Sequence, residues 1–236
     1  MFYMSKNKRR LNYSFTAAFA GFIFGFDTIV ISGVDQKLQD LWHSTDLFHG
    51  LVVIGMALWG TVIGAIFGGL PTNYFGRKKT LLWIGYLYSI SAIGSAISSD
   101  PITFAFFRFI GGIGIGISTI AAPAYISEIS APNERGKLVG YYQLNIVAGI
   151  LIAFVSNFFL KEFGESSWRI MLGIEAIPAI VYTVMIMYIS QSPRWTYLNG
   201  YIAKSEQIYE ELFSSSEKEV FLKEISENKN EFEKMK

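Results

Sequence analysis

The stretch LNYSFTAAFAGFIFGFDTIVISGV, Leu11–Val34, decides the fold of this chain. It is almost entirely apolar, and it is long enough to cross the hydrocarbon core of a bilayer, which takes about 20 residues of helix. Its one acidic residue, Asp27, lies inside the apolar run. Because a charged side chain near the bilayer centre costs at least about 2.5–3.5 kcal/mol, Asp27 is expected to face a bundle interior or a water path.

Five further apolar segments of similar length follow. They are Phe48–Leu70, Thr80–Ser98, Ile102–Ser127, Leu138–Leu160 and Trp168–Ser190. One such segment could be a core helix of a soluble protein, but six joined by short polar links are typical of a polytopic membrane protein. Since backbone polar groups find no partners in lipid, all six are expected to be helices. The predicted fold class is all-α, with a six-helix transmembrane bundle over residues 11–192.

The composition agrees with a membrane protein and excludes several other classes. Hydrophobic residues make up 51% of the chain and charged residues 17%, whereas soluble domains carry about 25% charged residues. The chain has no cysteine, and its net charge of +1 gives no reason to expect nucleic acid as a partner. His43 and His49 lack metal-ligand spacing, and no nucleophile–base pair stands out, so we expect no metal, no cofactor and no enzymatic activity.

The distribution of Lys and Arg predicts the orientation in the cell membrane. Residues 1–10, the links after the second and fourth spans, and the first few residues after the sixth span hold ten of them: Lys6, Lys8, Arg9, Arg10, Arg77, Lys78, Lys79, Arg135, Lys137 and Arg194. The other links hold only Lys37 and Lys161. By the positive-inside rule, both termini are expected to be cytoplasmic. The first span is too long for a signal peptide and carries Asp27, so we interpret it as uncleaved.

Residues 193–236 have the character of a cytoplasmic linker built from amphipathic helices. Apolar residues recur there at helical intervals, with a break near Ser214–Ser216. These residues are Ile208, Leu212, Phe213, Val220, Phe221 and Ile225. For the last ten residues a frayed charged tail is an equally good interpretation.

Arg108 lies inside the fourth predicted span, and Glu175 lies inside the sixth. Burial favours the neutral form of a carboxyl group, whereas a nearby cation favours its ionised form, so a buried acid and base together suit a proton-linked transporter. The alternative is a static ion pair that ties the first span to the fourth. For Glu175, the alternative is a buried, protonated side chain.

Seven motifs occur in an order that is typical of one family. They are GFDTIVISG (25–33), GGLPTNYFGRKK (68–79), RFIGGIGIG (108–116), YISEISAPNERGKL (125–138), QLNIVAGILIA (143–153), WRIMLGIEAIPA (168–179) and SQSPRW (190–195). Together they resemble the N-terminal half of a sugar porter of the major facilitator superfamily. The resemblance implies a proton-coupled monosaccharide transporter that carries a hexose or pentose.

The resemblance also implies roles for single residues. Asp27 matches the proton carrier, Arg108 its partner, and Glu175 a secondary proton or packing site. Gln143 and Phe24 match groups that line the sugar site, although an interhelical bond of Gln143 is the alternative. The residues that match a cytoplasmic gating network are Gly76, Arg77, Lys78, Glu128, Arg135 and Arg194. A solvated loop is the alternative for that network, and Gln191 stands where the family motif usually has Glu.

Members of the family have about twelve spans in two halves, with the substrate held between the halves. The sequence therefore predicts that the second bundle is absent and that this chain is inactive alone. Two alternatives remain, a half-transporter that works as a homodimer or with a separate second half, and a non-transporting membrane sensor. The expected partners are a monosaccharide, a proton, the lipid bilayer, and the missing half or a second copy.

Overall fold

The computed structural model describes residues 5–214 and residue 217. Within these residues every regular element is helical. The elements are α1 (Lys6–Val30), η1 (Ile31–Gly33), α2 (Asp35–Trp42), α3 (Asp46–Phe48), η2 (His49–Ile54), α4 (Gly55–Phe67), α5 (Gly69–Tyr74), α6 (Arg77–Ile97), α7 (Pro101–Ile129), α8 (Arg135–Leu160), α9 (Ser167–Gly173), α10 (Ala176–Tyr188), α11 (Pro193–Leu198) and α12 (Ile202–Leu212). The all-α prediction is confirmed for the described part of the chain.

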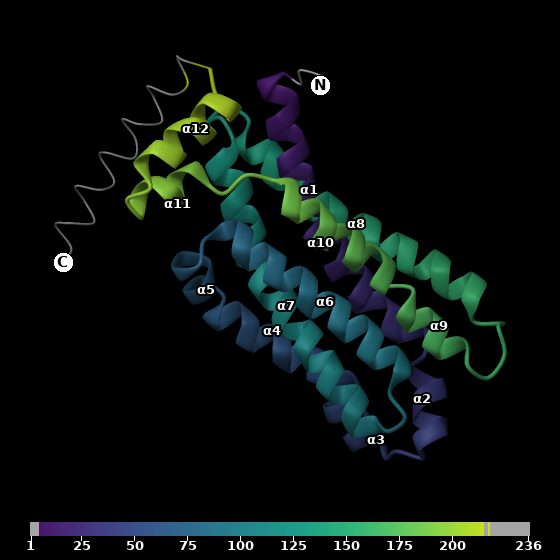
Figure 1. Ribbon diagram of the computed structural model, residues 1–236. Coiled ribbons are helices and arrows are strands. Elements are labelled where there is room, and N and C mark those ends of the chain that lie inside the picture. Colours follow the sequence, from purple (N-terminus) through teal and green to yellow (C-terminus); the bar gives the residue numbers. More distant parts are fainter. Residues whose placement is uncertain (1–4, 215–216, 218–236) are drawn as a thin grey trace.

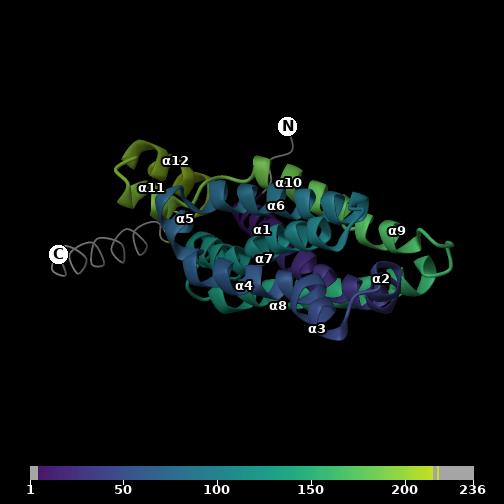
Figure 2. The same ribbon diagram turned by 90° about the horizontal axis from the view of Figure 1, so that it is seen from below.

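Six helical stretches are long and apolar enough to cross a membrane. They cover Lys6–Gly33, Asp46–Phe67, Arg77–Ile97, Pro101–Ile129, Arg135–Leu160 and Ser167–Tyr188. Each overlaps one predicted span, and the bounds differ by a few residues. The helices run side by side along one long axis, with α11 and α12 at one end and α2 and α3 at the other (Figures 1 and 2). The prediction of six spans is confirmed.

Small residues let two pairs of helices approach closely. A Cβ added to Gly64 of α4 would overlap the backbone of α7, and one added to Gly116 of α7 would overlap the backbone of α4. In the same way, a Cβ added to Gly25 of α1 would overlap the backbone of α8, and one added to Gly149 of α8 would overlap the backbone of α1. In lipid, where no hydrophobic force drives helices together, such close backbone contact supplies much of the association. The glycine spacing in the sequence thus sets which helices are neighbours.

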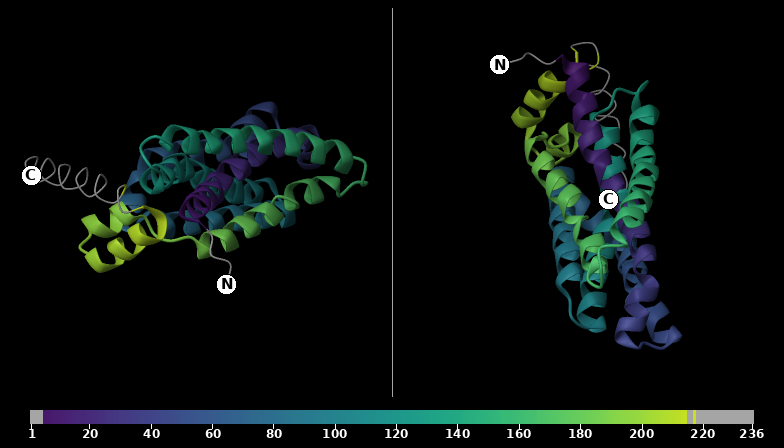
Figure 3. Two further views of the ribbon diagram at one scale, coloured as in Figure 1. Left: turned by 90° about the horizontal axis from the view of Figure 1, so that it is seen from above. Right: turned by 90° about the vertical axis from the view of Figure 1, so that its right-hand side faces the viewer.

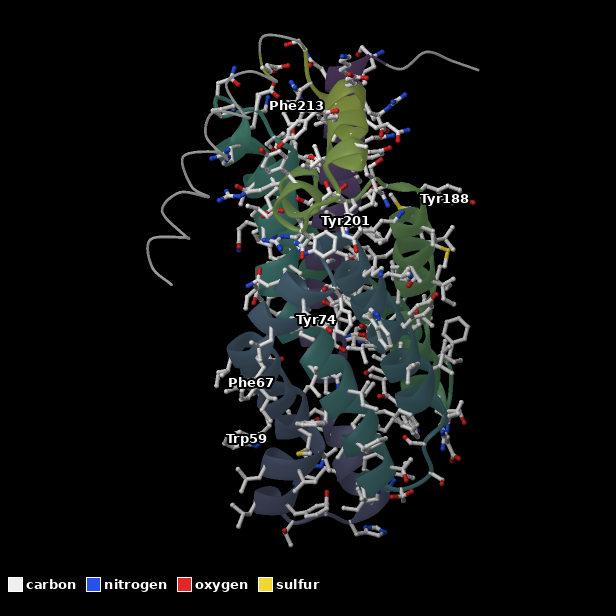
Figure 4. All side chains as sticks on the ribbon, turned by 60° about the vertical axis from the view of Figure 1, so that its left-hand side comes forward. Trp59, Phe67, Tyr74, Tyr188, Tyr201 and Phe213 are labelled. Carbon is white, nitrogen blue, oxygen red and sulfur yellow. The ribbon has the colours of Figure 1, made fainter. Side chains whose placement is uncertain are left out.

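The bundle is apolar outside and holds charged groups inside. Trp59 and Phe67 of α4 are 55% and 56% exposed, and both point away from the bundle in Figure 4. In contrast, Asp27, Arg108 and Glu175 are at most 3% exposed. A soluble domain rarely exposes apolar surface on this scale. The arrangement fits a protein whose surrounding solvent is the hydrocarbon of a bilayer.

The sixth span is interrupted at its centre. Helix α9 ends at Gly173 and α10 begins at Ala176. Pro178 has no backbone N–H and cannot donate to the Ile174 carbonyl, which accepts from the Ile177 N–H at 3.1 Å instead. The interruption places Glu175 between the two helices.

The N-terminus of α1, the α5–α6 and α7–α8 links, and helices α11 and α12 gather at one end, which we call the terminal end. Figure 3 shows α12 beside the start of α1. Ile208, Leu212 and Phe213 are at most 5% exposed there, which confirms an amphipathic helix up to this point. The helical spacing of Val220, Phe221 and Ile225 predicts a further amphipathic helix, which lies outside the described residues.

Candidate functional site

A buried ion pair joins α1 to α7 in the middle of the bundle. Arg108 donates through Nη1 to Oδ1 of Asp27 and through Nη2 to Oδ2, the second bond measuring 3.1 Å. Nη2 also reaches the Asp27 backbone carbonyl at 3.4 Å. The Asp27 side chain is 5% exposed and the Arg108 side chain is 3% exposed. A two-pronged guanidinium–carboxylate pair of this kind is geometrically specific as well as strong.

Glu175 completes this group, which we call the central site. The buried Glu175 carboxyl group interacts electrostatically with both Asp27 and Arg108. With both acids ionised, the site would carry two negative charges against one positive charge. The geometry therefore suits a site that holds one exchangeable proton.

A chain of hydroxyl groups lies in the same core. Ser118 of α7 accepts hydrogen bonds from Tyr88 of α6 at 3.1 Å and from Tyr142 of α8 at 3.0 Å, and donates to the Ile115 carbonyl at 2.7 Å. Tyr88 also interacts electrostatically with Asp27. Sequence reasoning missed this chain because hydroxyl residues are frequent in spans. The only feature of the sequence that pointed to these three hydroxyl residues is that each lies within an apolar run.

The two predicted sugar-site residues differ in their surroundings. Phe24 lies one turn before Asp27 on α1, is partly buried and packs against the core. Gln143 of α8 is exposed. Within the described residues its amide forms no hydrogen bond, so it is accessible to a ligand or to further helices. Their role in sugar binding stays a prediction.

At the terminal end, a second ion pair joins α6 to α7. Arg77 Nη2 and Glu128 Oε1 are 2.8 Å apart, with side chains that are 15% and 9% exposed. Ser192, just before α11, donates to the other Glu128 oxygen at 2.5 Å. Arg77 also donates to the Thr72 carbonyl at 3.1 Å. Glu128 thus links the starts of α6 and α11 to the end of α7.

Gly76 and Gln191 shape the start of α6. Gly76 has a φ of +85°, and a Cβ there would overlap the side chains of Gln191 and Trp195. The Gln191 Oε1 accepts from the Lys78 backbone N–H at 2.8 Å, which satisfies one of the free donors at the helix start. Lys78 Nζ in turn donates to the Met187 carbonyl at 2.9 Å. The amide at position 191 is therefore a helix cap, and its neutrality does not break the contact.

Two further residues of the predicted gating network, Arg135 and Arg194, lie at the starts of other helices. Arg135 is the first residue of α8, and Arg194 lies in the first turn of α11. Arg194 forms no ion pair among residues 5–214 and 217. The gating role of the whole set stays a prediction.

Sequence reasoning missed the part that Arg10 plays at the terminal end. Arg10 is 2% exposed. Its guanidinium donates to the Leu212 carbonyl at 3.3 Å and pairs with Glu217 at 2.9 Å and Glu134 at 3.2 Å. It therefore ties α1 to the end of α12 and to the start of α8. In the sequence it is one of four clustered cations, and nothing distinguishes it from the other three.

The comparison with known proteins fits this geometry. A sequence profile for the family described as "Sugar (and other) transporter" matches residues 13–236. The chain belongs to the sugar transporter family. The glucose transport protein of Synechocystis sp. is 39% identical over 203 residues, which are 81% of this chain and 43% of that protein. The arabinose-proton symporter of Escherichia coli is 35% identical over 215 residues, which are 90% of this chain and 45% of that protein.

Among solved structures, the sugar transporter fold is matched by the proton:xylose symporter XylE bound to 6-bromo-6-deoxy-D-glucose. The TM-score is 0.86 at 27% identity, over 94% of this chain and 53% of that one. The chain thus spans about half the length of the sugar transporters that it resembles. Its six helices correspond to one half of the major facilitator fold.

Proposed function

We propose that this chain forms the first half of a transporter that couples the movement of a monosaccharide to that of a proton. The observation that carries the proposal is the central site, a fully buried acid–base group in a family whose members include proteins named as arabinose-proton and D-xylose-proton symporters. A hexose or a pentose is the proposed substrate.

The proposed coupling rests on the pairing of Asp27 with Arg108. While the guanidinium contacts Asp27, the ionised carboxylate is favoured and a proton is released. When a conformational change withdraws Arg108, the buried carboxylate loses its counter-ion and takes up a proton. Glu175 receives or passes on this proton, since its buried carboxyl group interacts with that of Asp27. Moving one charge through the membrane potential is worth about 2.3 kcal/mol per 100 mV, which is enough to drive accumulation.

The proposed sugar site adjoins the central site. The Gln143 amide offers two donors and an acceptor, which match the paired hydroxyls of a sugar. Phe24 supplies an aromatic wall one turn from Asp27. Because the sugar and the proton then share one region of the bundle, binding of one favours binding of the other.

We place the terminal end on the cytoplasmic side of the cell membrane, on the strength of its basic residues. There Gly76, Arg77, Lys78, Glu128, Arg135 and Arg194 form the proposed gating network. The Arg77–Glu128 pair holds the end of the bundle in one arrangement, and its opening accompanies the change of access.

The transporting unit is proposed to contain a second six-helix half, supplied by a separate chain, by the same polypeptide or by a second copy. The supporting observation is the exposure of two helices: only 22% of the most apolar window is buried in the second span and in the fifth, against 61% in the first. These flanks, on α4 and α8, are the proposed contact surface. A site-specific crosslink from α8 should capture the partner. Recovery of lipid alone would favour a bundle that senses a ligand without transporting it.

Uptake of labelled arabinose, xylose and glucose into membrane vesicles tests the function. The vesicles should contain this chain together with a second half, and an inward proton gradient should be imposed. We expect accumulation of one of these sugars and its collapse when a protonophore is added. Accumulation that ignores the gradient would contradict proton coupling, and saturable sugar binding without uptake by the assembled protein would contradict transport.

A further inference from the structure

A pocket of about 240 Å³ lies between the first turns of α1 and α8, at the terminal end of the bundle. Lys8 and Leu11 of α1 line it on one side, and Lys137 and Tyr141 of α8 line it on the other. The pocket takes no part in the proposed sugar path or gating network. It combines two cations with an aromatic and an aliphatic side chain.

The two lysines give the pocket a net positive charge. Lys8 and Lys137 are both exposed, and neither ammonium forms an ion pair within the described residues. The acidic residue of the lining, Glu134, already pairs with Arg10 at 3.2 Å. Arg10 also pairs with Glu217, so it compensates Glu134 only in part; the two lysines still leave these five charged groups with a net charge of +1, and both ammonium groups are accessible to an external anion.

Each lysine heads an apolar stripe. On α1, Leu11 and Phe15 follow Lys8 at three and seven residues and are 45% and 46% exposed. On α8, Leu144 follows Lys137 at seven residues and is 62% exposed. Residues at these spacings lie on one face of a helix. Both lysines thus lie just beyond the apolar part of a span, at the level where lipid head groups meet the hydrocarbon.

The pocket opens away from the proposed sugar path. Tyr141 lines the pocket, whereas Gln143 lies two residues later, which is about 200° around a helix of 3.6 residues per turn. The two side chains therefore leave α8 on nearly opposite sides. A ligand in the pocket would lie on the outer side of the bundle, next to the bilayer.

We propose that this pocket binds the phosphate group of an anionic phospholipid. Lys8 and Lys137 hold the phosphate, while the acyl chains follow Leu11 and Phe15 on one helix and Leu144 on the other. Basic pockets between membrane helices are suited to this ligand, because the lipid supplies both the negative charge and the apolar chains. The lipid bridges α1 and α8, which meet again at Arg10 and Glu134.

Lipid retention by the purified protein tests the proposal. The protein is reconstituted in nanodiscs that contain phosphatidylglycerol and phosphatidylcholine, transferred to mild detergent, and examined by native mass spectrometry for bound lipid. The test variant is Lys8→Gln/Lys137→Gln. The control is Lys79→Gln/Lys204→Gln, which removes the same charge from exposed residues of the same end outside the pocket. A variant with both pocket lysines changed to Arg checks that charge is the property required.

We expect the protein to retain phosphatidylglycerol over phosphatidylcholine, and the Lys8→Gln/Lys137→Gln variant to bind it about 25-fold more weakly, since each cation near the surface contributes about a factor of five. The control and the arginine variant should bind as the unchanged protein does. An equal loss of lipid binding in the control would overturn the proposal, because the lipid would then be attracted by the overall positive charge of this end and not by the pocket. Displacement of the lipid by millimolar glycerol phosphate would also overturn the proposal, because the pocket would then bind a soluble phosphate without needing acyl chains.

Discussion

The molecule carries charged groups in two places, and their surroundings differ. In the central site, the pair of Asp27 and Arg108 is no more than 5% exposed, and Glu175 adds a second acid without a second base. At the terminal end, the acids that pair with Arg10 are 31% and 42% exposed, so water reaches them. Solvent can therefore relieve excess charge at the end of the bundle, whereas in the middle it cannot, which is why we propose that a proton binds there.

The largest expected effect comes from removing the buried cation. Arg108→Leu leaves two buried carboxyl groups without a counter-ion, and breaking a buried pair in this way costs about 3–5 kcal/mol. The midpoint of denaturation in detergent should fall accordingly. The double variant Asp27→Asn/Arg108→Leu should recover part of the loss. If the double variant were as unstable as the sum of the two single variants, the pair would not be coupled.

A smaller effect is expected from the ion pair at the terminal end. Glu128→Gln removes the charge that binds Arg77 and Ser192, and hydrogen bonds to charged groups contribute about 1.5–3 kcal/mol. Since Arg77 is partly exposed, 1 M salt should narrow the difference in denaturation midpoint between Glu128→Gln and the unchanged protein. Salt should leave the effect of Arg108→Leu unaltered. The same salt response at both places would remove the distinction between them.

The turn before α6 is expected to contribute about as much as a single strained residue. Gly76→Ala forces a side chain onto a backbone with φ of +85° and ψ of 159°, a region that is essentially restricted to glycine, at a cost of about 1–3 kcal/mol, and also displaces the Gln191 cap. Gly69→Ala is the matched control, because a Cβ there meets nothing within 4 Å and its backbone is helical. Only the first substitution should lower the denaturation midpoint. Equal midpoints would mean that the turn is not tightly held.

The smallest expected effect comes from Asp100, the N-cap of α7, which lies at the end of the bundle opposite to the terminal end. Hydrogen bonds from the Thr103 side chain and backbone, with one from the Ile102 N–H, lower the pKa of the Asp100 carboxyl. A group whose pKa is lowered on folding stabilises the protein above its unfolded pKa, and this stabilisation is lost as the pH falls through the folded value. The difference in denaturation midpoint between the unchanged protein and Asp100→Ala should be constant near neutrality and shrink below about pH 4. Asp100→Asn should show a weaker pH dependence, because its amide caps without charge.

Much of the fold could be predicted because lipid imposes a simple constraint. Apolar runs of the right length must become helices, so the six spans followed from residue type and length alone. Gly64 and Gly116 lie where α4 and α7 touch, but which helix each glycine faces is known only from the structure. The interruption of the sixth span had a local signal in Pro178, but only the fold brings Glu175 against Asp27.

The rest could not be predicted because it depends on which side chains meet. Arg10 is buried while its neighbour Lys8 is exposed, and the difference arises from the docking of α12. The hydroxyl chain through Ser118 joins three helices that are far apart in the sequence. Ser192 had a visible signal as a helix cap before proline, yet its bond to Glu128 needed the end of α7 beside it.

The most direct test of the central claim compares uptake by Asp27→Asn and Glu128→Gln in vesicles where this chain is assembled with a second half. We predict that Asp27→Asn abolishes sugar accumulation driven by a proton gradient while leaving exchange of labelled for unlabelled sugar. Glu128→Gln should change the rate but still allow accumulation. Unchanged gradient-driven accumulation with Asp27→Asn would contradict the assignment of proton coupling to the central site.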